Sequence, residues 1–325
     1  FFFKQKTAYE IRNCDWSSDV CSSDLRYFGA LDDHTQHLAM SVTKSFVGLV
    51  AALLVHDGQI DPEKTVPHYV PELAGTAFGD ATLRQVMDMT TGVRYSETYS
   101  DPSAEIWAYT ASAGITGRPD GYSGPEGIFD FLRSLKKEGQ HGAAFAYKTC
   151  NTEVLGVVVQ RVAGRRLPDL ISDLIWQRLG VEEDGYMLVD RTGMPMCGGG
   201  LNVTLRDLAR FGDMMRQRGY FNGQQIIPEA VVADIERGAS RADFACAGYK
   251  STPGWSYRNQ WWVTHDDFGT YAARGIHGQA ILIIPRADLV VVRFASHPTA
   301  SNVDSELDSL SLPAWRALAE HLMRK

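Results

Sequence analysis

The sequence predicts an α+β protein, in which a mostly helical stretch precedes a group of antiparallel strands. Three observations support this class. Helical patterns alternate with loops from residue 41 to 219, short apolar runs separated by turns follow from residue 260, and one amphipathic helix closes the chain. Helices and strands that are segregated along a sequence are typical of α+β folds.

The composition is that of an ordinary globular protein of 325 residues, 44% of them apolar and 22% charged. A chain of this length has room for about two domains and for a large core without disulfides. Its formal net charge of −7 offers no positive surface for nucleic acid or anionic membranes. No apolar run in the sequence reaches the ~20 residues of a membrane-spanning helix. Nucleic-acid partners and a membrane span are therefore not expected.

Residues 1–25 differ from the rest of the chain, because they show neither helical nor strand periodicity. Lys4 to Ile11 and Cys14 to Leu25 resemble the translation of a sequencing-library adapter, so we expect a segment of technical origin with no structural role. A natural disordered tail is the alternative. The cysteines outside this segment are Cys150, Cys197 and Cys246. Their spacing predicts neither a disulfide framework nor a zinc site.

The first helix predicted after this segment begins at Ser41 and ends at the Asp57-Gly58 pair. It is apolar on nearly every face from Phe46 to Val55, which predicts a buried central helix. Three prolines between residues 62 and 71 then predict a loop, and residues 81–92 predict a short helix. Residues 93–127 are rich in Tyr, Ser, Gly and Asp without periodicity, which indicates a long functional loop.

Amphipathic patterns predict four further helices, over residues 127–137, 151–163, 167–178 and 205–219. Strands are predicted over residues 260–265, 269–276, 280–284 and 289–295, with a turn at 285–288. The last predicted helix spans residues 313–323. It has Pro313 in its first turn, where the missing N–H has no helical partner to lose.

The main chemical signal is a Ser-x-x-Lys pattern at Ser41 and Lys44. A spacing of three on a helix places both side chains on one face, where the amine can take the hydroxyl proton. The lysine can do so only if burial or nearby charge lowers its pKa. The same pattern occurs at Ser134 and Lys137 in a charged helix end, so the pattern alone leaves a plain N-cap serine as an equal alternative for Ser41.

Two further elements fit acyl transfer. Tyr147 stands just before a predicted helix, where a tyrosine near a lysine can pass protons; a core aromatic is the alternative. Gly275 and Gly278 flank Ile276 and His277 in a predicted strand. Glycine there permits a ligand to approach backbone N–H groups that can hold an oxyanion. For His277 a core or turn position is favoured over a direct catalytic role.

Together and in this order, these elements resemble the serine penicillin-recognising family, which includes class C β-lactamases, D-Ala-D-Ala carboxypeptidases and related esterases. The resemblance runs from about residue 38 to the end of the chain and is strongest to the 6-aminohexanoate-dimer hydrolase branch. Its motifs here are MSVTKS, VPHYVPELAG, YSETYSDPSAE, FAYKTCNTEVLG, RTGMPMCGGGLNVTLRDLARFG and GIHGQ. It implies a β-lactamase/transpeptidase-like fold, with an antiparallel sheet flanked by helices and a mostly helical domain.

The resemblance also implies a role for each motif residue. Ser41 would be the acyl-forming nucleophile, Lys44 its general base and Tyr147 the acid that protonates the leaving group. The N–H groups of Ile276 and Ser41 would form the oxyanion hole. The substrate-binding residues would be Tyr99, Trp262, His277 and Gly275. No metal or organic cofactor is implied, because these groups complete an acyl-transfer cycle.

Three departures from the family pattern bear on the substrate. The Tyr-x-Asn of β-lactamases is Tyr147-Lys148-Thr149 here, and their Lys-Thr-Gly is Ala273-Arg274-Gly275. The cation that binds a β-lactam carboxylate is thus absent from its usual place, unless Arg274 replaces it. An acidic residue of the 6-aminohexanoate-dimer hydrolase branch aligns near Thr110, which is uncharged.

These departures favour a hydrolase of small carboxylic esters, with weak or absent amidase activity. A β-lactamase or D-Ala-D-Ala carboxypeptidase is the alternative among enzymes, and a non-catalytic ligand-binding relative is the alternative from another class. The expected partner is a small-molecule ester or amide. The oligomeric state is open, with a homodimer as one option, and so is the compartment, for which we slightly favour the cytoplasm over the periplasm or the exterior.

We expect two domains with the active site at their interface: a sheet domain of residues 26–60 and 205–325, and a mostly helical domain of residues 61–204. Only residues 26–40 separate the adapter-like segment from Ser41, so N-terminal strands of the sheet are expected to be missing and one edge to be exposed. Six aromatic residues are candidates for an apolar acyl pocket: Tyr95, Tyr99, Trp107, Tyr257, Trp261 and Trp262. At least half of them are expected to be ordinary packing residues.

Overall fold

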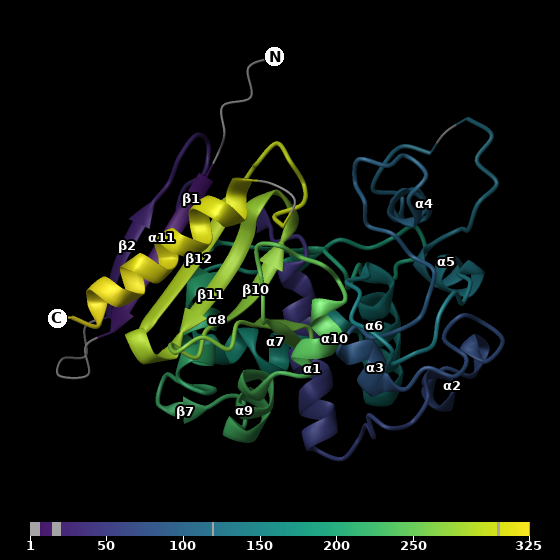
Figure 1. The fold of residues 1–325 in the computed structure, drawn as a ribbon, viewed down its shortest axis with the longest axis horizontal. Helices are drawn as coiled ribbons and strands as arrows, with labels where there is room; N and C mark the ends of the chain where they lie inside the picture. Colours follow the sequence, from purple (N-terminus) through teal and green to yellow (C-terminus); the bar gives the residue numbers. More distant parts are fainter. Residues whose placement is uncertain (1–6, 15–20, 119, 304–305, 325) are drawn as a thin grey trace.

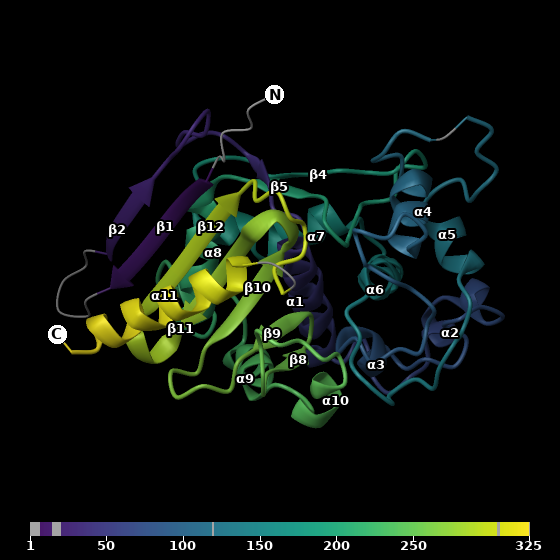
Figure 2. The same cartoon turned by 45° about the horizontal axis from the view of Figure 1, so that its top comes forward.

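The computed structural model describes residues 7–14, 21–118, 120–303 and 306–324. Its largest sheet is antiparallel and has seven strands in the order β2-β1-β12-β11-β10-β9-β8. Helix α8, Leu205–Arg216, packs on one face of this sheet, and helix α11, Glu306–Leu322, lies across the opposite face (Figure 1). The other large group of helices stands beside the sheet (Figure 2). The predicted α+β class is confirmed.

The strands predicted in the C-terminal part are present. They are β9 Trp261–Val263, β10 Tyr271–Gly275, β11 Gln279–Ile284 and β12 Leu289–Ala295, preceded by β8 Ser256–Arg258. In β11, Ile281 and Ile283 join the core shared with α8, whereas Leu282 and Ile284 join the cluster beneath α11. Side chains alternate across a strand, so a sheet covered on both faces has continuously apolar strands.

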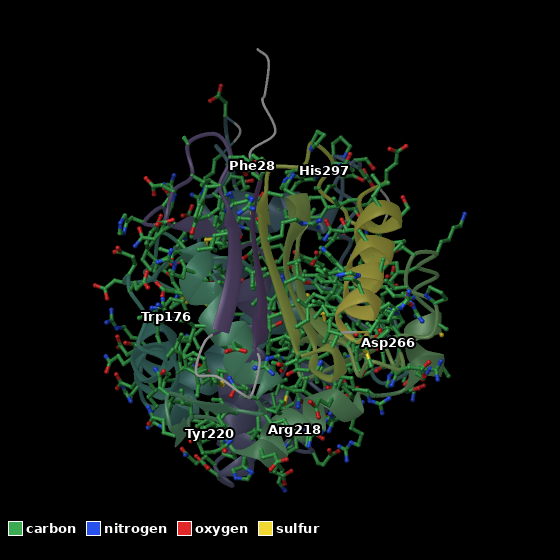
Figure 3. All side chains as sticks on the ribbon, turned by 90° about the vertical axis from the view of Figure 1, so that its left-hand side faces the viewer. Phe28, Trp176, Arg218, Tyr220, Asp266 and His297 are labelled. Atoms are coloured by element: carbon green, nitrogen blue, oxygen red, sulfur yellow. The ribbon has the colours of Figure 1, made fainter. Side chains whose placement is uncertain are left out.

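Two strands lie in the segment for which we expected no structural role. β1, Thr7–Cys14, pairs with β12, and β2, Cys21–Arg26, pairs with β1; Figure 3 faces this side of the molecule, with the two purple strands beside the yellow strand and helix. A sheet edge pairs through backbone hydrogen bonds, so an extended segment joins it without an alternating side-chain pattern. The structure thus differs from the expectation of no structural role at residues 7–14 and 21–26. Whether native N-terminal strands are missing stays a prediction. Whether the segment derives from an adapter stays a prediction.

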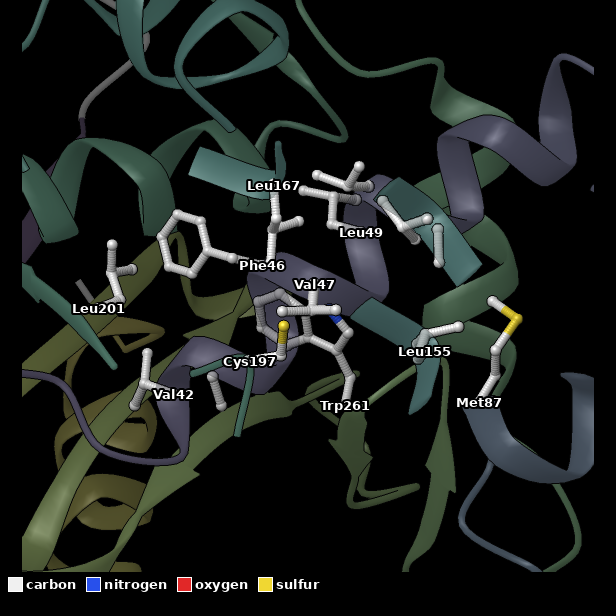
Figure 4. Close-up of a cluster of buried hydrophobic side chains, with 14 of the residues drawn as sticks. Val42, Phe46, Val47, Leu49, Met87, Leu155, Leu167, Cys197, Leu201 and Trp261 are labelled. Atoms are coloured by element: carbon white, nitrogen blue, oxygen red, sulfur yellow. The ribbon is translucent and has the colours of Figure 1, made fainter. Parts of the chain in front are cut away.

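Helix α1, Val42–His56, is the buried central helix that the sequence predicts. All its residues from Val42 to Leu54 are buried, and Figure 4 shows part of the apolar cluster around it. It packs against α6, Thr149–Ala163, and α7, Leu167–Leu174, and against strands β9 to β11. Helix α1 thus contacts both the sheet and the helical group.

Two segments predicted as loops contain helices. The proline-rich loop holds α2 Val66–Tyr69 and a 3₁₀ turn Pro71–Leu73, whose prolines occupy first-turn positions. The predicted loop at residues 93–127 holds α4, Glu105–Ala113. Its buried Ile106, Tyr109 and Ala113 follow a helical spacing, but the run is too short to stand out among the surrounding polar residues.

The helix predicted over residues 313–323 begins earlier, at Glu306, so Pro313 lies inside α11 rather than in its first turn. An internal proline removes one backbone hydrogen bond. Contacts on both sides of it offset this loss, because Asp308 is paired with Arg274 and Leu312 packs on the cluster beneath the helix.

The remaining helices and turns are α3 Leu83–Met87, α5 Ile128–Ser134, η2 Trp176–Leu179, α9 Glu229–Arg237, α10 Arg241–Ala245, η3 Ile276–Gly278 and η4 Pro285–Ala287. The remaining strands are β3 His37–Leu38, β4 Tyr186–Met187, β5 Leu201–Val203, β6 Tyr220–Phe221 and β7 Gln224–Gln225. Within the described ranges, no helix combines the length and the apolarity that crossing a membrane requires.

Candidate active site

Ser41 lies immediately before α1, where the chain turns from the small sheet into the helix. The N–H of Ala39 donates to the carbonyl oxygen of Leu201 at 2.8 Å, which fixes the entering strand. Met40 has a φ of 49°, a left-handed conformation that is uncommon outside glycine. Ser41 is 9% exposed, and its hydroxyl accepts no capping bond from the described helix backbone. This geometry does not support the plain N-cap alternative.

Lys44 lies one turn further along α1 and is 1% exposed. Its Nζ is 2.9 Å from Ser41 Oγ and donates to the carbonyl oxygen of Gly198 at 2.6 Å. Burial lowers the pKa of Lys44 from its usual value, and the carboxylates of Glu97 and Glu153 oppose this shift. A lowered pKa makes the neutral amine accessible, and only the neutral amine can accept the Ser41 proton.

Tyr147 completes a three-residue cluster with Ser41 and Lys44. Its ring centroid is 5.3 Å from Lys44 Nζ, and it lies near enough to Ser41 for that side chain to oppose the rise that burial causes in the pKa of Tyr147. Trp262 stacks on the ring, with a centroid distance of 5.3 Å. Burial raises the pKa of Tyr147, the Glu97 carboxylate raises it further, and the Arg274 guanidinium opposes the rise. Tyr147 therefore keeps its proton at neutral pH and is suited to donate it.

Strand β10 ends at Gly275, beside the residues that lead into Ser41. A Cβ built on Gly275 would lie 2.8 Å from the carbonyl oxygen of Ala39 and 3.0 Å from Met40 Cβ. Only glycine therefore lets β10 approach the chain this closely. Ile276 follows at once and lines the same pocket as Ser41. Whether their two N–H groups face one substrate oxygen stays a prediction.

His277 lies at the rim of the pocket and adopts a φ of 59°. Its N–H donates to the carbonyl oxygen of Ala300 at 3.0 Å, and its Nδ1 is 2.8 Å from the carbonyl oxygen of His297. These contacts hold the loop at residues 297–300 and favour the turn position that the sequence left open for His277.

A pocket of about 920 Å³ opens beside this cluster, large enough for a small organic substrate. Its wall includes residues from the sheet part and from the helical part of the chain. Of the six aromatic candidates, those that line it are Tyr99, Trp107 and Trp262. The other three, Tyr95, Tyr257 and Trp261, are buried in the core. Half of the candidates are thus packing residues, as expected, while the two-domain division stays a prediction.

Arg274 and Thr110 lie on the wall of this pocket. The Arg274 guanidinium is paired with Asp308 of α11 and lies over Trp262, 5.2 Å from the ring centroid. Arg274 thus reaches the pocket and is paired with Asp308 through Nη2, while its Nη1 has no hydrogen-bond partner among the described residues. Thr110 Oγ1 donates to the carbonyl oxygen of Trp107 at 3.0 Å, so this part of the wall has no charge of its own.

Sequence reasoning missed Glu97, which lines the pocket beside Tyr99. It accepts a hydrogen bond from the N–H of Thr149, the first residue of α6. A carboxylate at a helix N-terminus is favoured by the helix dipole and by the free N–H groups there. The hydroxyl of Tyr99 lies 3.5 Å from Glu97 Oε2. Glu97 therefore links the loop that carries Tyr99 to the helix that follows Tyr147.

Sequence reasoning also missed Glu153 of α6, which is fully buried. It accepts hydrogen bonds from the Tyr109 hydroxyl at 2.6 Å and from the N–H groups of Gly198 at 2.7 Å and Cys197 at 3.1 Å. Burial raises the pKa of Glu153, and these hydrogen bonds oppose the rise. The available signal was an acidic residue inside an otherwise apolar helical run.

Gly198 is hydrogen-bonded to both Lys44 and Glu153, through its carbonyl oxygen and its N–H respectively. A Cβ there would lie 2.3 Å from Thr149 Cγ2, 2.9 Å from Glu153 Oε1 and 3.6 Å from Lys44 Nζ. We expect Gly198→Ala to lower kcat/KM by about 10²-fold, because a displacement of about 1 Å in an active site has an effect of this size. Steady-state kinetics on an activated ester measures it.

Gly75 is the matched control, because a Cβ there meets no described atom within 4 Å. Gly75→Ala should retain wild-type kinetics. Wild-type kinetics in Gly198→Ala as well would show that the Gly198 peptide does not need its present position.

Comparisons with known proteins agree with this geometry. The Beta-lactamase family model matches residues 23–310. The 6-aminohexanoate-dimer hydrolase of Paenarthrobacter ureafaciens is 38% identical over 282 residues, which cover 86% of this chain and 71% of that protein. A Bacillus anthracis structure provisionally assigned as a 6-aminohexanoate-dimer hydrolase is 32% identical, with a TM-score of 0.87 and coverage of 98% of this chain and 80% of that one.

A more distant structure, that of EstCE1, a hydrolase with promiscuous acyltransferase activity, shares the fold at 17% identity. Its TM-score is 0.71, with coverage of 98% of this chain and 93% of that one. The family matches confirm the resemblance that the motifs indicate, and the fold likeness extends over nearly the whole chain. The chain is a hydrolase of the serine β-lactamase family.

Proposed function

We propose that the protein hydrolyses small carboxylic esters through an acyl-enzyme intermediate on Ser41. The observation that carries this proposal is the buried contact of 2.9 Å between Lys44 Nζ and Ser41 Oγ, with Tyr147 against both groups. A serine hydroxyl is a weak nucleophile until a neighbouring base takes its proton. Here the base is pre-positioned, and its pKa is lowered by burial.

The first half of the cycle forms the acyl-enzyme. Neutral Lys44 takes the Ser41 proton while Ser41 Oγ bonds to the ester carbonyl carbon. The negative charge on the former carbonyl oxygen is held by the N–H groups of Ser41 and Ile276. The carbon–oxygen bond to the leaving group then breaks, and Tyr147 gives its proton to the departing alkoxide. Lys44 re-protonates Tyr147, so both groups return to their starting states.

The second half releases the acid. A water molecule takes the place of the leaving alcohol and loses a proton to the Tyr147–Lys44 pair as it bonds to the acyl carbon. The bond to Ser41 Oγ breaks, and Ser41 recovers its proton from Lys44. Because Tyr147 has a raised pKa and Lys44 a lowered one, the first acts as proton donor and the second as acceptor in the resting site.

Esters are favoured over amides and β-lactams for reasons that lie in the pocket wall. Its aromatic residues suit an apolar acyl group, and Thr110 provides no charge for a charged amide substrate. Arg274 pairs with Asp308, so a β-lactam carboxylate at this position would share the guanidinium with Asp308. The buried Ser41–Lys44 contact favours an enzyme over a non-catalytic binding protein, which needs no activated hydroxyl.

Turnover of matched substrates tests this preference. We expect p-nitrophenyl acetate and butyrate to be hydrolysed faster than the corresponding p-nitroanilides, and nitrocefin to be the poorest substrate. Nitrocefin turnover comparable to that of the esters would favour the β-lactamase alternative. A protein that binds ester analogues but turns over none of these compounds would be the non-catalytic relative.

Replacement of Tyr147 by phenylalanine tests its role as proton donor. Phenylalanine keeps the stacking on Trp262 and removes only the hydroxyl. A p-nitrophenolate leaves without protonation, so we expect kcat/KM for its esters to fall less than tenfold. For ethyl esters or anilides we expect a fall on the order of 10²-fold or more, because their leaving groups need a proton. Equal losses for both substrate classes would contradict this role.

A further inference from the structure

The carboxylate of Glu153 is buried beside Lys44, outside the described lining of the substrate pocket. Two hydrogen bonds connect it to Lys44 through the Gly198 peptide. The N–H of Gly198 donates to the Glu153 carboxylate, and Lys44 Nζ donates to the carbonyl oxygen of Gly198. Tyr109 and the N–H of Cys197 complete the surroundings of the carboxylate. Glu153 does not line the pocket among the described residues, whereas its partners Tyr109 and Gly198 do.

The hydrogen bond to Gly198 has a specific consequence for a neutral lysine. A neutral amine has two N–H donors and one lone pair, whereas the ammonium has three donors and no lone pair. When one N–H of the neutral amine points to the Gly198 carbonyl oxygen, the lone pair can turn toward Ser41 Oγ. The position of the Gly198 peptide therefore decides whether Lys44 presents an acceptor to the nucleophile.

The charge of Glu153 acts on the same amine. The titratable groups that face Lys44 are Glu97, Glu153, Cys150, Cys197 and the ring of Tyr147. Both carboxylates favour the ammonium, and burial disfavours it. Glu97 is partly exposed at the pocket, whereas Glu153 is fully buried, so solvent screens the Glu153 charge least.

We propose that Glu153 is a positioning residue of the active site, which fixes the Gly198 peptide for Lys44 and sets the pH range in which Lys44 works. This inference rests on the proposed role of Lys44 as the base for Ser41. It goes beyond that role by assigning a function to a buried carboxylate that touches neither the substrate pocket nor the nucleophile.

The test is the pH dependence of kcat/KM for p-nitrophenyl butyrate in Glu153→Gln. Glutamine keeps the size of the side chain and one acceptor oxygen but removes the charge. Removal of a nearby negative charge lowers the pKa of an amine, so the neutral form of Lys44 extends to lower pH. We expect the acidic limb of the profile to shift to lower pH by about one unit, because nearby opposite charges shift a pKa by about 1–3 units.

Tyr109→Phe is the second variant, which keeps the carboxylate and removes one hydrogen bond to it. Loss of that bond disfavours ionised Glu153, so we expect a smaller shift of the acidic limb in the same direction. If Glu153→Gln does not fold, this variant alone carries the test. If the folded variants lose kcat/KM equally at every pH and their acidic limb stays in place, Glu153 has a purely structural role. That result would overturn the inference.

Ser41→Ala, measured with the same ester, separates this inference from the proposed function. If Ser41→Ala keeps wild-type turnover, the proposed nucleophile is wrong, whether or not the acidic limb of Glu153→Gln shifts. If Ser41→Ala is inactive and the acidic limb of Glu153→Gln stays in place, only the role of Glu153 is wrong. An inactive Ser41→Ala with a shifted limb in Glu153→Gln supports both.

Discussion

Replacement of Lys44 by methionine is expected to lower kcat/KM on activated esters by about 10³-fold, within the range that general acid–base catalysis supplies. Methionine fills nearly the same buried volume and cannot accept a proton. Ser41 Oγ would then lose its partner at 2.9 Å, and the Gly198 carbonyl oxygen would lose its donor at 2.6 Å. Steady-state kinetics together with a thermal melt separates this chemical loss from unfolding.

The second Ser-x-x-Lys pattern of the chain provides the control. Lys137 pairs with Asp80 at the surface, and Ser134 Oγ donates to the carbonyl oxygen of Phe131 at 2.7 Å. The two side chains therefore have separate partners, although their spacing matches that of Ser41 and Lys44. Exposed ion pairs contribute little to stability, so Lys137→Met should have wild-type kinetics. A loss of activity in Lys137→Met as large as in Lys44→Met would contradict the assignment of the base.

The parts of the fold that depend on local pattern were predictable from the sequence. Helix α1 is apolar on every face over three turns, and only a buried helix has that pattern. Strands β9 to β12 are apolar runs bounded by turns, and all of them appear near their predicted positions. In each case the signal lies within about ten consecutive residues.

Pairing at the sheet edge was not predictable, because it depends on backbone groups that every residue carries. β1 joins β12 through such groups, in a segment whose side chains give no strand signal. The start of α11 was missed for a different reason. Pro313 is typical of a first turn, and the buried pair of Asp308 and Arg274 that supports the preceding turn joins residues far apart in the sequence.

In the candidate site, too, some residues were predictable from the sequence and others were not. Ser41 and Lys44 are one helical turn apart, so their contact follows from the spacing, and the motif resemblance adds Tyr147. Glu97 and Glu153 approach Lys44 only through the packing of α1 against α6 and the loops beside it. No spacing in the sequence indicates that approach. The groups that tune the base are therefore visible only in the folded chain.

The central claim is that Ser41 is the nucleophile, and covalent labelling tests it most directly. Serine hydrolases form a stable adduct with a fluorophosphonate, and intact-protein mass spectrometry counts the adducts formed per chain. We expect one adduct on the wild type and one on Ser134→Ala, because the Ser134 hydroxyl is bonded within its own helix.

Ser41→Ala should give no adduct and should lose hydrolysis of p-nitrophenyl esters, because alanine has no atom to carry the acyl group. The result that supports the assignment is one adduct on the wild type and none on Ser41→Ala, with both proteins folded. The result that would contradict it is an unlabelled wild type, or an equal adduct on Ser41→Ala.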